Sequence, residues 1–355
     1  YGLVGRLCWL PRVVPSVPKP EEQVGPMIRY IGTRLILAIP VLLAVFTLVF
    51  LVVRIIPGDP AQAALGDYAS GQAVEALRER MGLNRPMFLD FEALQQGDLG
   101  GLFDSQYVFY LGQLVRGNLG DSLITGNSIS EQIAYALPYT LQLTFASVLI
   151  GVALGVPIGV LTAVKRNSAI DYLGRVLSLA GLSVPAFYFA ILLIFIFAVN
   201  LGWLPSVGGG DLQEDPVGTL KYLILPALTL GLIMTTSIVR LTRSAMLNVL
   251  SEDYVRTARA KGVNERTVLL KHALRSALLP IVSVTGIWIA SLIGDSVLTE
   301  VVFNRPGLGK ILVGSILQRD YTALQSIMVI YAAFVVAVNL LTDLTYGWLD
   351  PRISR

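Results

Sequence analysis

The sequence has one cysteine, Cys8, and one histidine, His272, among its 355 residues. A lone cysteine excludes an internal disulfide, and neither residue type is frequent enough to build a metal site from several cysteines or histidines. Charged residues are also scarce, at 14% of the chain against about 25% in soluble proteins. The net charge of +3 gives no indication of nucleic-acid binding. These shortages exclude a disordered chain and disfavour an ordinary soluble enzyme.

Long apolar segments take the place of the missing charge. Six windows of 18 to 24 residues contain no Asp, Glu, Lys or Arg. Because a helix needs about 20 apolar residues to cross a bilayer, these windows predict six transmembrane helices. The alternative, buried core helices of a large globular domain, is disfavoured by the length of the runs. The windows are 35–53, 141–164, 176–199, 222–239, 277–294 and 321–342.

The distribution of Lys and Arg predicts the orientation of the helices. With the N-terminus inside, the cytoplasmic segments hold 18 of the 27 basic residues. The long segment 55–136 holds ten Asp or Glu against four Arg, which fits the external side. We therefore expect both termini in the cytoplasm.

The windows divide the chain into five parts. Residues 1–26 are rich in proline and lack a long apolar run, so we expect an extension outside the fold. The first transmembrane helix occupies 27–54, the external segment 55–136, the remaining five helices 137–347, and a cytoplasmic tail 348–355. In the external segment, a helix near 72–81 is predicted, with Ser70 as its N-cap and Gly82 at its end. The loop-rich remainder is either a solvated segment without a binding role or a docking face for an external partner.

Small and acidic residues mark particular positions on the predicted helices. Gly151, Gly155 and Gly159 recur every four residues, which favours close helix packing, with the wall of a translocation pathway as the alternative. Asp295 and Glu300 lie at the outer end of the fifth window, and Asp343 at the inner end of the sixth. We expect these carboxylates to be exposed to headgroup water. No carboxylate lies in mid-membrane, where a proton relay would need one.

The loop 247–277 is basic, yet its apolar residues have helical spacing. Gly262 separates two halves, which predicts a helix–turn–helix parallel to the membrane. Ser251 is the expected cap of the first helix, and Asp253 suits its first turn. A basic helix lying on anionic lipid is one interpretation. A compact projection that fits a groove on a soluble partner is the other, and the glycine break favours it.

The stretch 251–280, SEDYVRTARAKGVNERTVLLKHALRSALLP, resembles the coupling loop, or EAA loop, of ABC-importer permeases. The resemblance is closest to the dipeptide, oligopeptide, nickel and glutathione branch, where EDYxRTARAKG followed by HALRxAxLP is typical. Arg256 stands at the acidic position of the general pattern, Thr257 at its first alanine, and the late proline arrives only at Pro280. The resemblance covers nearly all of 27–355, including Pro57-Gly58-Asp59-Pro60, Met81-Gly82-Leu83-Asn84-Arg85-Pro86, Glu300, Pro306-Gly307-Leu308-Gly309, Arg319-Asp320-Tyr321 and Asp350-Pro351-Arg352-Ile353.

This resemblance implies an all-α polytopic protein of the bacterial inner membrane, with six transmembrane helices in the type I importer arrangement and residues 137–347 as its transmembrane domain. Its partners would be a second, homologous permease in a heterodimer, two ABC ATPase subunits, an external solute-binding protein and the lipid bilayer. The chain itself would bind no cofactor and no metal, since ATP and Mg belong to the ATPases. Short peptides are the expected solute, with glutathione, nickel chelates or oligosaccharides as alternatives.

The resemblance also assigns candidate residues. The ATPase-coupling candidates are Tyr254, Arg256, Thr257, Ala258, Arg259, Ala260, Lys261, Gly262, His272 and Leu274. The candidates for an external gate or docking face are Asp59, Glu300, Pro306, Gly307 and Gly309. A lone His272 is expected to pack or hydrogen-bond in the loop and not to bind a metal.

Two other classes are disfavoured. An aspartyl intramembrane protease is suggested by Gly208-Gly209-Gly210-Asp211, but this motif falls in an external loop without a mid-span aspartate, and His272 is misplaced for a serine–histidine type. A secondary transporter or channel would need mid-membrane ionisable residues or an inverted repeat. ATP hydrolysis by the chain itself is not expected, because Gly309-Lys310 is followed by Ile311 and lacks the P-loop pattern.

Overall fold

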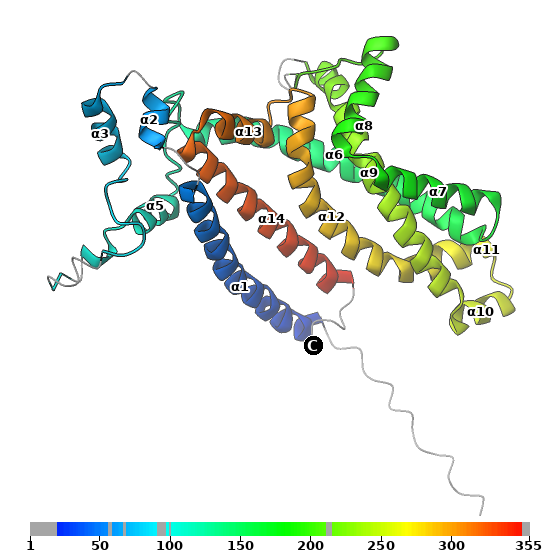
Figure 1. The fold of residues 1–355 in the computed structure, drawn as a ribbon. Coiled ribbons are helices and arrows are strands. Elements are labelled where there is room, and N and C mark those ends of the chain that lie inside the picture. Colours follow the sequence, from blue (N-terminus) through cyan, green and yellow to red (C-terminus); the bar gives the residue numbers. More distant parts are fainter. Residues whose placement is uncertain are drawn as a thin grey trace, which may run out of the picture.

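The computed structural model describes residues 20–55, 59–66, 69–90, 97–98, 101–210 and 215–349, and this part of the chain is helical without β-strands (Figure 1). The external segment contains α2, α3, η1 and α5, and long helices precede and follow it along the chain. The elements are α1 (Pro20–Ile55), α2 (Pro60–Leu65), α3 (Gly71–Arg80), η1 (Gly101–Phe103), α5 (Gln106–Val115), α6 (Ile129–Val164), α7 (Ala169–Ser183), α8 (Ala186–Leu193), η2 (Ile194–Asn200), α9 (Pro216–Leu250), α10 (Asp253–Ala260), α11 (Glu265–Thr267), η3 (Val268–Ala273), α12 (Leu274–Val302), α13 (Leu308–Gln318) and α14 (Tyr321–Leu349).

Some predictions fall outside these described residues. They concern most of the N-terminal extension, the end of the cytoplasmic tail, Asp211 of the glycine-rich motif and the exposure of the Asp343 side chain.

Five of the six predicted windows lie within single helices that are long and apolar enough to cross a membrane. Several helices extend well past the windows. Each window stops at the first charged residue, whereas the backbone hydrogen bonds of the helix continue beyond that residue. α9, for example, continues to Leu250, beyond the predicted window end at residue 239. α6 likewise begins at Ile129, upstream of the predicted boundary at residue 137, and α1 begins at Pro20 rather than at residue 27.

The third window is broken. The helix axis bends by 103° between α7 and the α8–η2 segment. The two parts form one span only if the bent pair is counted together. Val184 has extended backbone angles between them, and Pro185 follows. The break has a local cause, because proline disfavours the helical conformation of the residue before it and lacks the N–H that a continuous helix would need.

The helix predicted near 72–81 is confirmed as α3. The Ser70 hydroxyl accepts a hydrogen bond from the Ala73 N–H, and Gly82 follows the helix with a φ of +66°. The remainder of the external segment is less loop-rich than expected, since α2 and α5 also form there.

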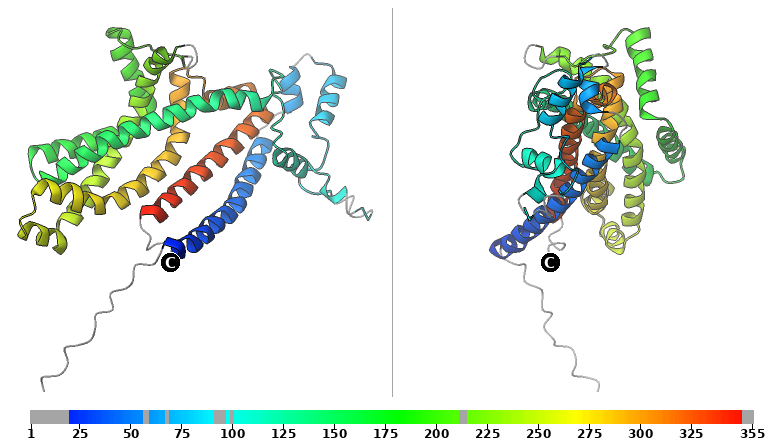
Figure 2. Two further views of the ribbon diagram at one scale, coloured as in Figure 1. Left: turned by 180° about the vertical axis from the view of Figure 1, so that it is seen from behind. Right: turned by 60° about the vertical axis from the view of Figure 1, so that its left-hand side comes forward.

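α6 and α9 pack against each other along much of their length, on the side of the bundle away from α1 (Figure 2). Gly151, Gly155 and Gly159 lie where α9 approaches most closely, and a Cβ at Gly155 would stand 2.6 Å from the Cβ of Ile238. Buried apolar residues continue the contact, among them Leu143, Leu230, Met234, Ile238 and Leu292. The glycines therefore let two long helices pack with their backbones close together.

Figures 1 and 2 place α10 and α11 at the end of the bundle where α1 begins and α14 ends. α2, α3 and α13 lie at the opposite end. The arrangement brings the segments predicted to be cytoplasmic to one side and those predicted to be external to the other.

This arrangement leads to a topology prediction. A reporter that is active only outside the cell should be active when fused at Gly97, and a reporter that is active only in the cytoplasm should be active at Asn264, because the basic residues flank the second position. Measuring both reporters at both positions in intact cells provides the reciprocal control. The reverse pattern would overturn the orientation.

Candidate functional site

The connection between α9 and α12 begins with a tight turn. Ser251 ends α9, and its hydroxyl donates to the Asn248 carbonyl at 2.7 Å. The prediction that Ser251 caps α10 is therefore wrong. Glu252 occupies the cap position without a side-chain hydrogen bond, and Asp253 lies in the first turn of α10, where its negative charge suits the positive end of the helix.

One apolar residue anchors α10. Val255 is fully buried, whereas its neighbours on the helix are mostly exposed. The Tyr254 hydroxyl adds a hydrogen bond of 3.0 Å to the Ser276 hydroxyl on α12. Beneath the connection lies a cluster of small and flexible apolar side chains from four elements, which fixes its base: Ala163, Ala245, Met246, Ala273, Ala277 and Ile281.

Gly262 makes the turn after α10. Its φ of +76° lies in the left-handed region, and no other atom lies within 4 Å of the position that a Cβ would take. Its N–H donates to the Arg259 carbonyl at 2.9 Å. The requirement for glycine is therefore conformational rather than steric.

An ion pair spans this turn. The Arg259 guanidinium donates to both Glu265 carboxylate oxygens, at 2.7 and 3.1 Å. Both side chains are about half exposed, so the pair contributes little to stability. It links the end of α10 to the start of the helix that follows across the Gly262 turn.

The second half of the predicted helix–turn–helix is not a separate helix. From Glu265 the chain runs through α11, the π-helical turn η3 and α12 as one element to Val302. No glycine interrupts residues 265–285, and the leucines, alanines and basic residues there are good helix formers. The loop is thus a short helix, a turn, and the start of a membrane helix.

Eight of the ten coupling candidates lie in α10 or in the turn that follows it, and His272 and Leu274 lie further along the helix that starts at Glu265. Seven are exposed, and Ala258, His272 and Leu274 are half-buried. The exposed basic side chains project from α10 and from the residue that follows it. The exposed candidates are Tyr254, Arg256, Thr257, Arg259, Ala260, Lys261 and Gly262.

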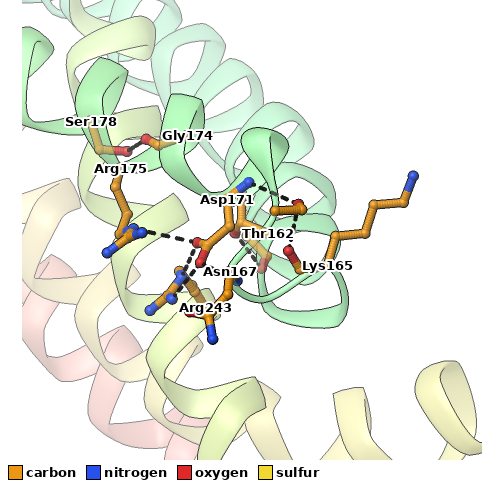
Figure 3. Close-up of polar contacts among 10 residues, drawn as sticks. Thr162, Lys165, Asn167, Asp171, Gly174, Arg175, Ser178 and Arg243 are labelled. Carbon is orange, nitrogen blue, oxygen red and sulfur yellow. Dashed lines mark hydrogen bonds and ion pairs between the residues drawn. The ribbon is translucent and has the colours of Figure 1, made fainter.

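A buried ion pair near this site was not predicted. The Asp171 carboxylate of α7 receives hydrogen bonds from Arg243 of α9 at 2.6 and 2.9 Å, and one from the Asn167 N–H at 3.0 Å (Figure 3). Arg175 approaches within 3.6 Å. Asp171 and Arg243 are 72 positions apart in the sequence, and only the fold brings them together. Asp171 is nevertheless the only acidic residue between the second and third windows, and that was an available signal.

At the opposite end, Glu300 is fully buried, so its expected exposure to headgroup water is wrong. The Thr140 hydroxyl and the Gly309 N–H each donate to its carboxylate at 2.7 Å. A Cβ at Gly307 would collide with that carboxylate. α12 therefore carries Glu300 into a polar nest made by α6 and the turn before α13, and Asp295 remains exposed as expected.

The structure brings Glu300, Gly307 and Gly309 together, with Pro306 in the same turn. Asp59 lies elsewhere: it caps α2 through the Ala61 N–H and pairs with Arg78. Burial alone would raise the pKa of Asp59, but hydrogen bonds from Arg78 and from the backbone outweigh burial and hold the pKa below its usual value. The described side chains hold no group of three or more His, Cys, Asp or Glu residues suited to a metal ion.

Known proteins match this helical arrangement over almost the whole chain. Residues 155–355 match the family model of the binding-protein-dependent transport system inner membrane component, and residues 27–144 match the model of its N-terminal region. The chain therefore belongs to this family of transport-system membrane components. The resemblance drawn from the coupling loop is confirmed, and the protease and secondary-transporter alternatives are set aside.

Individual relatives and a solved structure agree with the family. The chain is 38% identical over 348 residues to the dipeptide transport system permease protein DppB of Alkalihalophilus pseudofirmus, covering 92% of this chain and 100% of the relative. It is 40% identical over 327 residues to the glutathione transport system permease protein GsiC of Salmonella typhimurium, covering 92% and 99%. The fold is similar to the inward-facing MetNI methionine ABC transporter, with a TM-score of 0.51 and 21% identity over 62% of this chain and 97% of that one.

Proposed function

We propose that this chain forms half of the solute pathway of an ATP-driven importer, and that α10 with the Gly262 turn is the element that an ATPase subunit binds. The observation that carries the proposal is the shape of the connection: a short, exposed, basic helix on a buried base of small apolar residues. A groove on a soluble partner can receive such a helix, and its mostly exposed polar face suits that role.

The proposal has a mechanical basis. Movement of α10 reaches the membrane helices because the Tyr254 hydroxyl bonds to Ser276 of the helix that starts at Glu265, and because Val255 is buried against the rest of the fold. That helix is continuous to Val302, so a displacement at its inner end is passed on within one element. The chain itself supplies no chemistry: hydrolysis of ATP, with its Mg, takes place on the partner subunits.

The complete assembly would contain this chain, a second homologous permease in a heterodimer, two ATPase subunits and an external solute-binding protein. Both termini of this chain would face the cytoplasm, as the distribution of Lys and Arg indicates. The binding protein would deliver the solute at the end that carries α2, α3 and α13.

Short peptides are the proposed solute. One relative is a dipeptide permease protein and another a glutathione permease protein, and both match this chain over nearly their whole length. Glutathione is itself a small peptide, so it is the second candidate. Nickel chelates and oligosaccharides follow as further candidates.

A charge reversal on α10 tests the binding role. Arg256→Glu with Lys261→Glu should reduce co-purification of the ATPase subunits by about tenfold or more, because it reverses the charge of the exposed face that the proposal assigns to the contact. Membrane levels of the chain should stay unchanged, since both side chains are exposed.

The matched control places the same two changes elsewhere. Arg116→Glu with Lys221→Glu alters two exposed basic residues outside the α9–α12 connection, and it should leave ATPase co-purification intact. Equal retention of the ATPases by both double variants would refute the assignment of α10.

A further inference from the structure

One face of α12 is left uncovered by the described part of the chain. α12 packs against α6, α8, α9, α13 and α14, and the residues that it still exposes fall on one side. At 3.6 residues per turn, the exposed residues of the stretch 287–298 lie within about 100° of one another on the helix surface. They are Ile287, Ser291, Gly294, Asp295 and Leu298.

This face is more polar than a helix surface that contacts lipid. Every exposed residue of α1 from Leu35 to Val52 is apolar, as contact with lipid requires. The uncovered face of α12 instead carries a hydroxyl, a glycine and a carboxylate within two turns. Because a carboxylate that faces hydrocarbon is costly, we expect this face to line water or a polar surface.

The Asp295 carboxylate lies below the outer end of the bundle. α12 continues past Asp295 to Val302, a distance of roughly 10 Å along the axis at 1.5 Å per residue. Leu292, on the preceding turn, belongs to an apolar cluster with Leu143 of α6 and Leu230 of α9. Asp295 is therefore set beside the apolar core of the transmembrane region and not at the tip of its helix.

The two polar side chains of this face are free to accept hydrogen bonds. The Asp295 carboxylate has no hydrogen-bond or ion-pair partner among the residues that the structure describes. The Ser291 hydroxyl donates its single hydrogen to the Ile287 carbonyl at 3.2 Å, so its lone pairs stay available. Residues four apart on a helix lie on the same side, with Cβ atoms about 5–6 Å apart. A positive group with several N–H donors fits this pair.

The space beside the pair is open. Gly294 is exposed, and beyond its own helix turn and chain neighbours no atom lies within 4 Å of the position that a Cβ would take there. A ligand can therefore come close to the helix backbone next to Asp295.

The chemistry of the solute selects the cation. A short peptide with a free N-terminus carries an ammonium group at neutral pH. Two acceptors, one of them charged, match its three donors, since hydrogen bonds between charged groups are the strong ones. We propose that Asp295 and Ser291 bind the N-terminal ammonium group of a peptide as it moves through the solute pathway. This assignment rests on the function proposed above, in which the chain forms half of a peptide pathway.

Asp295→Asn tests the contact, because it keeps the shape of the side chain and removes its charge. In proteoliposomes that hold the whole assembly, with the binding protein outside, uptake of dialanine should fall about tenfold or more, since a charge-assisted hydrogen bond is lost. Asp295→Glu should retain most uptake, and Ser291→Ala should give a smaller loss. Glu131→Gln removes the same charge at an exposed position in the first turn of α6 and should transport as the wild type does.

Two outcomes would overturn the proposal. One is dialanine uptake by Asp295→Asn at the wild-type rate. The other is loss of the second permease from the purified Asp295→Asn assembly, which would assign the carboxylate to a contact between subunits.

A labelling experiment separates this proposal from the choice of solute. Cys8 is the only cysteine of the sequence, so Cys8→Ser gives a background without thiols. In that background, Asp295→Cys should react with a water-soluble maleimide, whereas Ile39→Cys on the exposed face of α1 should not. An unreactive Asp295→Cys would refute a water-lined face. A reactive Asp295→Cys in an assembly whose wild type imports no dialanine would refute the proposed solute and leave the water-lined face in place.

Discussion

The variant Gly262→Val is expected to reach the membrane in normal amounts and to lose solute uptake by about tenfold or more. A β-branched residue in the left-handed region is strained by about 1–2 kcal/mol, and it can relieve the strain only by changing the turn. Beyond the adjacent residues, no atom lies within 4 Å of the position that the new Cβ would take. The damage should therefore be confined to the angle between α10 and the helix from Glu265, with ATP hydrolysis continuing while transport fails.

Two controls separate this effect from general backbone strain. Gly262→Asn should retain most transport, because asparagine tolerates the left-handed region. Gly126→Val places the same residue at a φ of +70°, also without neighbours, in an external turn, and it should leave coupling intact. Uptake and ATPase rates would be measured on the same reconstituted preparations. Normal uptake by Gly262→Val would count against the coupling role of this turn.

Removal of Arg243 is expected to destabilise the chain by about 2 kcal/mol, between the values for exposed and deeply buried ion pairs. Arg243→Ala leaves the Asp171 carboxylate covered by the fold without its two-pronged partner. The full cost of a buried pair is not reached, because Arg175 and the Asn167 N–H remain and Arg243 is itself 20% exposed. Thermal unfolding in detergent, followed by loss of monodisperse protein, measures the effect.

The companion variants test the cause. Arg175→Ala should cost less than about 0.5 kcal/mol, since Arg175 is half exposed and more distant. Asp171→Asn combined with Arg243→Ala should be more stable than Arg243→Ala alone, because the unpaired charge is gone. A double variant that is no better than Arg243→Ala would mean that lost packing, and not charge, causes the destabilisation.

Local signals in the sequence were sufficient for much of the fold. Charge-free windows located the membrane helices, since burying a charge in lipid is costly. Ser70 and Gly82 bounded α3, because capping depends on a few neighbouring residues. Pro185 could also have been recognised as the site of the break in the third window, for the same local reason.

Features that depend on distant residues were not predictable in this way. Glu300 was expected at the water interface from its position at a window end, but Thr140, from a different helix 160 positions earlier, covers it. Asp171 finds Arg243 only through the packing of α7 against α9. The coupling residues were found by family resemblance, and the structure adds that eight of the ten lie in α10 or in the turn after it. Their role in coupling stays a prediction.

The uninterrupted helix from Glu265 to Val302 has a thermodynamic consequence. One end belongs to the proposed ATPase contact, and the other carries Glu300 into its nest near α13. Suppose that binding of the ATPase favours one position of this helix, and that an external ligand also binds better to that position. Linkage then requires that each partner changes the affinity of the chain for the other by the same factor. A docked receptor outside and a nucleotide inside would then affect each other's binding through this one helical segment.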